Sequence, residues 1–202
     1  DDFCALAFFG KLFRQAQVLA GGAAAKTLHH RVDDSRPEWS RDTLNRVVDL
    51  HVSGSSFRYH ALLEDWRERN GQSVWTYGGS PSSTQSALGI EAQALDLYGR
   101  GVDGFVPWLT LGGDKNWTQF ETTCVFYNGK SMGVSGPCAS LRLKAYRRSE
   151  QDVEYLQLLA EKKGLLQGDP SRRQIGKVIS GAIQATKKLG VLDDQGAVTE
   201  SF

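Results

Sequence analysis

Four short stretches with strand character alternate with helical stretches across the first half of this chain, and this alternation constrains the fold more than any other feature. The strand patterns lie at residues 27–33, 48–53, 73–77 and 104–108. The helical patterns lie at residues 3–19, 38–47, 59–70 and 90–99. Short strands that alternate with helices at this spacing predict parallel βα units in an α/β fold.

The polarity of the strands favours one of the two architectures that such units can build. The first strand carries Leu28, His30 and Val32 on one face, with His29, Arg31 and Asp33 on the other. The second carries Val48, Leu50 and Val52 on one face, with Asp49, His51 and Ser53 on the other. One apolar face for the helices and one polar face fit a barrel lumen better than an open sheet covered on both sides.

A (β/α)8 barrel has eight strands and about 250 residues, twice the number of strands expected here. The sequence therefore predicts the carboxyl-terminal half of a TIM-type (β/α)8 barrel, about four βα units, over residues 1–163. A long helix is expected at 141–163. Residues 164–202 are expected to form a last helix and a tail that pack on the barrel or trail from it.

Composition removes several classes of protein. The 24 Lys and Arg balance the 23 Asp and Glu to a net charge of +1, so no basic footprint predicts nucleic-acid binding. The sequence contains no run of 18 or more apolar residues, so it predicts no membrane span. Three cysteines without CxxC spacing predict no structural zinc, although Cys124 and Cys138 could pair if the protein is exported. The chain starts at Asp1 rather than Met, which suggests a mature product or a piece of a longer protein, and no signal fixes its compartment.

Candidate site residues follow from the strand ends, because barrel active sites lie where the strands end. Read in order, these ends hold Arg31 with Asp33, His51 with Ser53, Trp75 with Tyr77, and Trp108. Aromatic faces beside charged groups suit a sugar, whose C–H faces stack on rings and whose hydroxyls need charged partners. The alternative is an ion pair inside the barrel with aromatic residues in the core.

Catalytic and metal patterns are weak. Asp33 and Asp34 are adjacent at a strand end and should point to opposite faces, so Asp33 is a weak catalytic candidate and the pair is a poor one. His29 and His51 on neighbouring strands could meet at a metal, although hydrogen-bonded roles suit them better. No metal is expected, because the four histidines show no HExxH motif and no helical i, i+4 pairing. No cofactor is expected, because the sequence holds no nucleotide-binding fingerprint.

Three long blocks carry a family resemblance, at residues 31–39 (RVDDSRPEW), 101–108 (GVDGFVPW) and 140–156 (SLRLKAYRRSEQDVEYL). Together they resemble the carboxyl-terminal catalytic region of proteins with a DUF4091 domain, related to glycoside hydrolase family 123. The similarity runs over roughly residues 1–160. It implies a TIM-barrel enzyme similar to β-N-acetylgalactosaminidases, in which the 2-acetamido group of the sugar attacks the anomeric carbon.

The family places a catalytic Asp-Glu pair just before the first helix, where this chain reads Asp1-Asp2-Phe3. The pair is therefore expected upstream. By resemblance, the contacts to a carbohydrate fall on Arg31, Asp33, Tyr77, Trp108 and Trp117. Whether this segment is itself an enzyme stays open against two alternatives, a non-catalytic carbohydrate-binding domain and a structural half-barrel that self-associates through open sheet edges.

Overall fold

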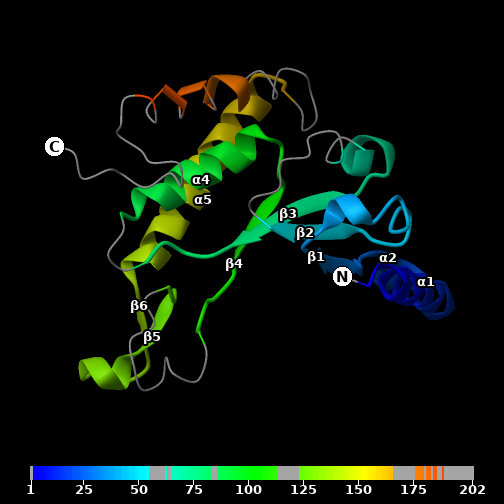
Figure 1. Ribbon diagram of the computed structural model, residues 1–202, viewed down its shortest axis with the longest axis horizontal. Helices are drawn as coiled ribbons and strands as arrows, with labels where there is room; N and C mark the ends of the chain where they lie inside the picture. The colour runs from blue at the N-terminus through cyan, green and yellow to red at the C-terminus, as the bar shows by residue number, and fades with distance from the viewer. Residues whose placement is uncertain are drawn as a thin grey trace. The chain divides into compact units, whose positions relative to one another are not determined.

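The computed structural model describes residues 2–54, 62, 65–82, 86–112, 123–165 and 176–179, with isolated positions between 181 and 188. The chain divides into two compact units (Figure 1). The first unit comprises Asp1–Gly78 and Val102–Val106, and the second comprises Gly79–Gly101 and Pro107–Phe202. The expected boundary between residues 163 and 164 stays a prediction.

The first unit is built on a parallel sheet, as the sequence predicts. Its strands are β1 (Arg31–Asp34), β2 (Leu50–Gly54), β3 (Ser73–Gly78) and β4 (Gly104–Pro107). They lie side by side in the order β1-β2-β3-β4, so neighbours in the chain are neighbours in the sheet. The α/β class is confirmed, and the first strand begins four residues later than its sequence pattern suggests.

Two helices precede the sheet. Helix α1 (Phe3–Ala20) agrees with the expected 3–19, and the Asp2 side chain caps it by accepting a hydrogen bond from the Ala5 N–H at 3.0 Å. Helix α2 (Gly22–Lys26) follows directly. Phe3, Leu6 and Ala7 of α1 pack on a core of Val32, Leu44 and Val48. This packing covers one face of β1.

The helix expected at residues 38–47 is wrong. Only a 3₁₀ turn, η1 (Pro37–Trp39), forms there, and turns follow up to residue 47. Arg41, Asp42 and Arg46 have φ angles of 44°, 64° and 65°, in the left-handed region. A right-handed helix cannot run through such residues. Of the helix expected at 59–70, the π-helix η2 (Asp65–Arg69) lies in the described part, while 55–61 and 63–64 fall outside it.

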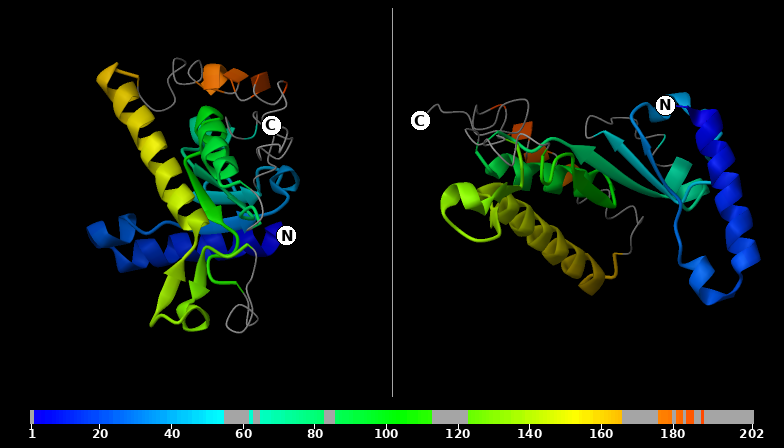
Figure 2. Two further views of the ribbon diagram at one scale, coloured as in Figure 1. Left: turned by 90° about the vertical axis from the view of Figure 1, so that its left-hand side faces the viewer. Right: turned by 90° about the horizontal axis from the view of Figure 1, so that it is seen from below.

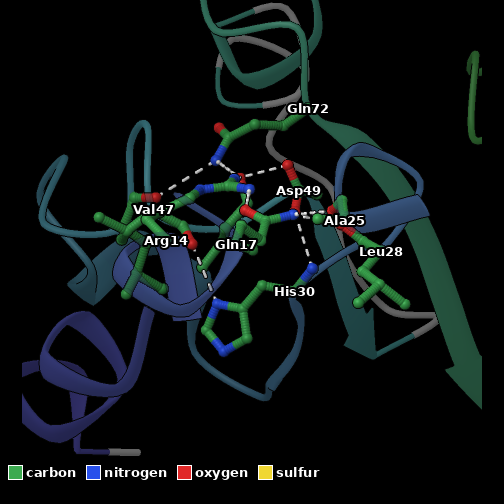
Figure 3. Close-up of polar contacts among 10 residues, drawn as sticks. Arg14, Gln17, Ala25, Leu28, His30, Val47, Asp49 and Gln72 are labelled. Atoms are coloured by element: carbon green, nitrogen blue, oxygen red, sulfur yellow. Dashed lines mark hydrogen bonds and ion pairs between the residues drawn. The ribbon is translucent and has the colours of Figure 1, made fainter. Parts of the chain in front are cut away.

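A polar network ties α1 to the amino ends of β1 and β2 (Figure 3). The Asp49 carboxylate accepts hydrogen bonds from Arg14 at 2.5 Å and from the His30 N–H at 2.7 Å. The Asp49 N–H in turn donates to the His30 carbonyl at 2.9 Å. Gln17 of α1 donates to the carbonyl groups of Ala25 and Leu28, so the helix also holds the chain that leads into β1.

The expected faces of the second strand are reversed. In the parallel register, Val32 lies beside His51 and Asp34 beside Ser53, whereas Asp33 lies beside Val52. Because Val32 faces α1, His51 and Ser53 lie on the helix-covered side and Val52 on the other. The faces of β1 were predicted correctly. For β2, hydropathy alone misassigned them, because its buried side carries polar residues that bond to one another.

The second unit contains two long helices and a hairpin. Helices α4 (Leu88–Gly99) and α5 (Leu141–Lys162) pack against each other (Figure 2). Strands β5 (Phe126–Asn128) and β6 (Pro137–Ala139) pair in antiparallel fashion around the 3₁₀ turn η4 (Gly129–Met132). The turn and the first residue of β6 thus lie within residues 129–137. Of the expected last helix, residues 176–179, 181, 182, 184, 185 and 188 are described, and all of them are helical.

The buried Arg142 side chain joins α5 to the chain before β5. Its guanidinium donates to the Cys124 carbonyl, at 3.0 Å from Nε, and to the Tyr127 hydroxyl.

Burial raises the pKa of Tyr146, which lies one turn after Arg142 in α5. A hydrogen bond with Ser80 and the charge of Arg142 lower this pKa and offset part of the effect of burial. Cys124 and Cys138 are both free thiols, so the disulfide that the sequence allowed for an exported protein is not formed. Within the described residues, no helix has the length and hydropathy of a membrane span.

Candidate functional site

The carboxyl ends of β1, β2 and β3 carry polar and aromatic side chains on both sides of the sheet, at the edge where α/β proteins place their sites. We name the two sides by the adjacent aspartates of β1. The Asp33 face holds Asp33 in register with Val52 and Trp75, and the Asp34 face holds Asp34 in register with Ser53 and Thr76. The two carboxylates thus point to opposite faces, as the sequence predicts.

A two-pronged ion pair marks the Asp33 face. Arg31 Nε donates to one oxygen of Asp33 at 2.8 Å and Arg31 Nη2 to the other at 3.0 Å. The hydrogen bonds that Arg31 donates to the Asp33 carboxylate raise the pKa of Arg31. The side chains are 46% and 57% exposed, so solvent or a ligand can reach both. Such an exposed pair adds little to stability.

A hydroxyl pair crosses the sheet on the same face. Ser35, directly after β1, and Tyr77 of β3 hydrogen-bond through their hydroxyls at 3.0 Å. Strand β2 runs between β1 and β3, and its residue in register with Tyr77 is Gly54. Because glycine carries no side chain, the phenol can reach across β2 to Ser35. The Ser35–Tyr77 pair thus closes the carboxyl end of the Asp33 face.

Trp75 lies between these features and packs on β4. A Cβ placed on Gly104 would stand 2.8 Å from three atoms of the Trp75 indole, so the ring lies directly against the Gly104 backbone. Real Cβ atoms essentially never stand this close to another heavy atom, so a larger residue at position 104 would force the ring or the strand to shift. The ring of Trp75 is half-buried.

The Asp34 face holds a second, fully buried cluster. The Asp34 carboxylate accepts from His51 Nδ1 at 2.9 Å and from Ser53 Oγ at 2.7 Å. Since a carboxylate can only accept, Nδ1 of His51 carries a proton. The imidazole lies flat on the Trp66 indole, with 3.8 Å between the ring centroids and 2° between the planes. None of these four side chains is more than 1% exposed.

The structure brings together three of the five expected contact residues. Arg31, Asp33 and Tyr77 share the Asp33 face of the first unit. Trp108 belongs to the second unit and is 65% exposed, whereas Trp117 lies outside the described residues. Asp33, the weak catalytic candidate, faces Arg31 rather than a second carboxylate.

Sequence reasoning missed two residues of the Asp33 face and the role of one cluster. Ser35 stands two residues after Asp33, so extending the strand alternation by one step would have found it. Trp75 was expected at a strand end but not among the sugar contacts. The bonding of Asp34 with His51 depends on the register between two strands, which the sequence does not state.

Metal binding finds no support in the described part of the chain. His29 is exposed before β1, and His51 is buried against Asp34, so the two do not meet. No group of three His, Cys, Asp or Glu side chains among the described residues is placed to hold a metal ion.

A scan of family models and a search of curated proteins found no match for the sequence.

Proposed function

We propose that this chain is the carboxyl-terminal half of a glycoside hydrolase-like (β/α) barrel and that its Asp33 face binds a 2-acetamido sugar. The proposal rests mainly on the arrangement of that face, where the exposed Arg31–Asp33 pair, Trp75 and the Ser35–Tyr77 pair meet at the carboxyl ends of parallel strands. Aromatic rings beside a carboxylate and a guanidinium are the groups that sugar recognition uses.

The strand order supports the barrel part of the proposal. A doubly wound sheet reverses its strand order at a switch point, and a barrel keeps the order of the chain. Here β1, β2, β3 and β4 follow one another without reversal. The family resemblance over residues 31–39 and 101–108 supports the same reading, since these blocks contain β1 and β4.

The proposal for the chain itself is binding rather than hydrolysis. The resemblance assigns catalysis to an Asp-Glu pair before the first helix, and the chain reads Asp1-Asp2-Phe3 there. A positioned general acid contributes about 10²–10⁴-fold to rate, and Asp33 is paired with Arg31 rather than with a second carboxylate, so the Asp33 face by itself should bind a sugar without cleaving it. We therefore expect a chromogenic N-acetyl-β-galactosaminide to be hydrolysed no faster than in buffer. Turnover that Asp33→Asn abolishes would instead make Asp33 a catalytic residue.

Binding is tested by titrating N-acetylgalactosamine into ¹⁵N-labelled protein, with galactose as the sugar that lacks the acetamide. We expect chemical-shift changes at Asp33, Ser35 and the Trp75 indole with the acetamido sugar. Arg31→Ala should weaken binding, whereas Lys11→Ala on the exposed side of α1 serves as a matched removal of one positive charge. Equal weakening by both variants, or equal shifts with galactose, would contradict the proposal.

A structural half-barrel is the second candidate, and α1 favours it. Phe8, Phe9 and Leu12 are 58%, 60% and 44% exposed on the side of the helix away from its core contacts. A helix that is apolar on two sides is typical of a position between two packed layers. A measurement of the oligomeric state distinguishes this candidate from sugar binding, because a structural half-barrel should self-associate.

A further inference from the structure

The buried cluster on the Asp34 face has no part in the proposed sugar contacts, and stability does not explain it. His51 Nε2 and Thr76 Oγ1 are buried there without a hydrogen-bond partner in the described part of the chain. Buried polar atoms without partners are unfavourable. Apolar residues of similar volume often serve stability as well as a buried polar cluster or better. A role other than stability should therefore account for the cluster.

Its position in β1 suggests that role. Asp34 lies between Asp33 and Ser35, and successive side chains of a strand point to opposite faces. The two bonds that Asp34 accepts both come from β2, from His51 at 2.9 Å and from Ser53 at 2.7 Å. They therefore fix β1 against sliding along β2 and against rotation about its own axis, at the residue between the two exposed ones.

The second point of attachment lies on the opposite face. The Ser35 and Tyr77 hydroxyls form a hydrogen bond at 3.0 Å. This contact requires the end of β1 to lie at the correct position along the strand direction relative to β2 and β3. The Arg31–Asp33 pair does not fix this position, because both of its members lie within β1. Among the described residues, the side-chain link from this end of β1 to β2 is therefore the buried cluster of Asp34 with His51 and Ser53.

We propose that Asp34, His51 and Ser53 are positioning residues, which hold the end of β1 so that Asp33 and Ser35 stand in the geometry of the Asp33 face. The effect on sugar affinity rests on the proposed function, whereas the placement of Ser35 against Tyr77 can be measured without any sugar. Sites whose first contacts are held by a supporting layer lose affinity when that layer is loosened.

The test compares Ser53→Ala and His51→Phe with Gln72→Leu. Gln72 is a matched control, because it is also buried in the first unit, donates to the Val48 carbonyl at 2.9 Å and leaves Oε1 without a partner, but it precedes β3. Nuclear Overhauser contacts between Ser35 and the Tyr77 ring, the amide shifts of Asp33 and Ser35, thermal melting and N-acetylgalactosamine affinity are measured on each protein.

We expect Ser53→Ala and His51→Phe to melt no lower than Gln72→Leu, to weaken the Ser35–Tyr77 contact and to lose affinity about five- to tenfold, the value of one hydrogen bond. If His51→Phe does not fold, Ser53→Ala decides, since it removes a single oxygen. An unchanged Ser35–Tyr77 contact overturns the proposal, and so does the same loss in Gln72→Leu. A weakened contact in a protein that binds no sugar sustains the positioning role and rejects the proposed function.

Discussion

Asp49 links three segments at one carboxylate, and its ionisation should therefore affect stability. Burial alone would raise the pKa of Asp49, but the hydrogen bonds from Arg14 and the His30 N–H, with the charges of Arg14 and His29, outweigh it and hold the pKa below the ordinary value of 3.8. A lowered pKa in the folded state means that the folded protein binds this proton less readily than the unfolded chain does.

The first prediction concerns acid. The contribution of Asp49 to stability should be complete above pH 4 to 5, and it should be lost as the pH falls through the folded-state pKa. Arg14→Gln should remove part of it, so the melting temperatures of variant and wild type should converge at low pH. Melting curves from pH 2 to 7 measure this, with Arg41→Gln as an exposed control outside the network. A constant difference over the whole range would contradict the assignment.

A second prediction at the same scale concerns Trp108, for which the sequence allowed a sugar contact or a core role. Trp108 is 65% exposed, so the core role is wrong. We expect Trp108→Ala to change the free energy of unfolding by no more than about 0.5 kcal/mol, as exposed substitutions do. Thermal melting checks this, and Trp66→Ala, which empties a fully buried position, should cost about 3–5 kcal/mol. A large loss in Trp108→Ala would restore the core role.

Single residues also show how far sequence reasoning reached into the site. Arg31, Asp33 and Tyr77 were found because each stands at a strand end, and strand ends can be read from hydropathy and turns. The partners of Asp34 could not be found in the same way. His51 and Ser53 have the polarity of an exposed face and are buried, because they satisfy a carboxylate that another strand supplies.

Among the elements, β2 and β4 begin with a shared device that the sequence analysis did not identify. Val48-Asp49 and Val102-Asp103 precede the two strands, and each aspartate accepts a backbone N–H from the preceding strand or its lead-in. Each also donates its own N–H to the same neighbour, His30 for Asp49 and Val74 for Asp103. An arginine reaches each carboxylate, Arg14 in one case and Arg67 in the other.

This device explains why the strand order could be expected from the sequence while the strand bounds could not. Consecutive strands with short connections pair with each other, which the alternating pattern already predicts. Where a strand begins depends instead on a side chain that precedes the next strand and bonds to its backbone, as Asp49 does with His30 before β1. Residues 28–30 accordingly have strand-like composition and lie outside β1, since the contacts of His30 run to Asp49 before β2 begins.

A third prediction tests the contact between β3 and β4. Gly104→Ala places a methyl group 2.8 Å from the Trp75 ring, so the ring or the strand must move. We expect a loss of about 1–3 kcal/mol, as overpacking usually gives, and a shift of the Trp75 indole N–H signal. Gly79→Ala is the control, because no heavy atom stands within 4 Å of a Cβ there and its φ is not in the left-handed region. Equal losses in both variants would mean that the close approach is not the cause.

At the scale of the whole molecule, composition and pattern predicted the α/β class, which is confirmed, and half of a (β/α)8 barrel, which stays a prediction. The four parallel strands are present and keep their order. Helix α4 follows β3 in the chain but belongs to the second compact unit, so the complete helical cover of a barrel is not reproduced in the first. The alternation of strands and helices predicts which elements form, whereas the grouping of elements into units depends on contacts between distant residues.

The last prediction joins two features of the first unit. Strand β1 lies at one end of the strand order, and edge strands carry backbone groups that can pair with another chain. Helix α1, which packs on the core beside β1, keeps Phe8, Leu12 and Leu19 exposed along its other side, and Leu19 is 87% exposed. Both features are unfavourable in an isolated monomer, because one leaves backbone groups unpaired and the other leaves apolar surface in water.

We therefore expect the chain to self-associate as its concentration rises, which sedimentation velocity measures directly. Phe8→Ser combined with Leu12→Lys should shift the protein towards monomer without lowering its melting temperature, because neither side chain belongs to the core of Val32, Leu44 and Val48. Gln15→Lys adds the same charge at an exposed polar position of the same helix and should leave association unchanged. A wild-type protein that stays a folded monomer at high concentration would contradict the half-barrel, because the apolar side of α1 would then be stable in water without a neighbouring layer.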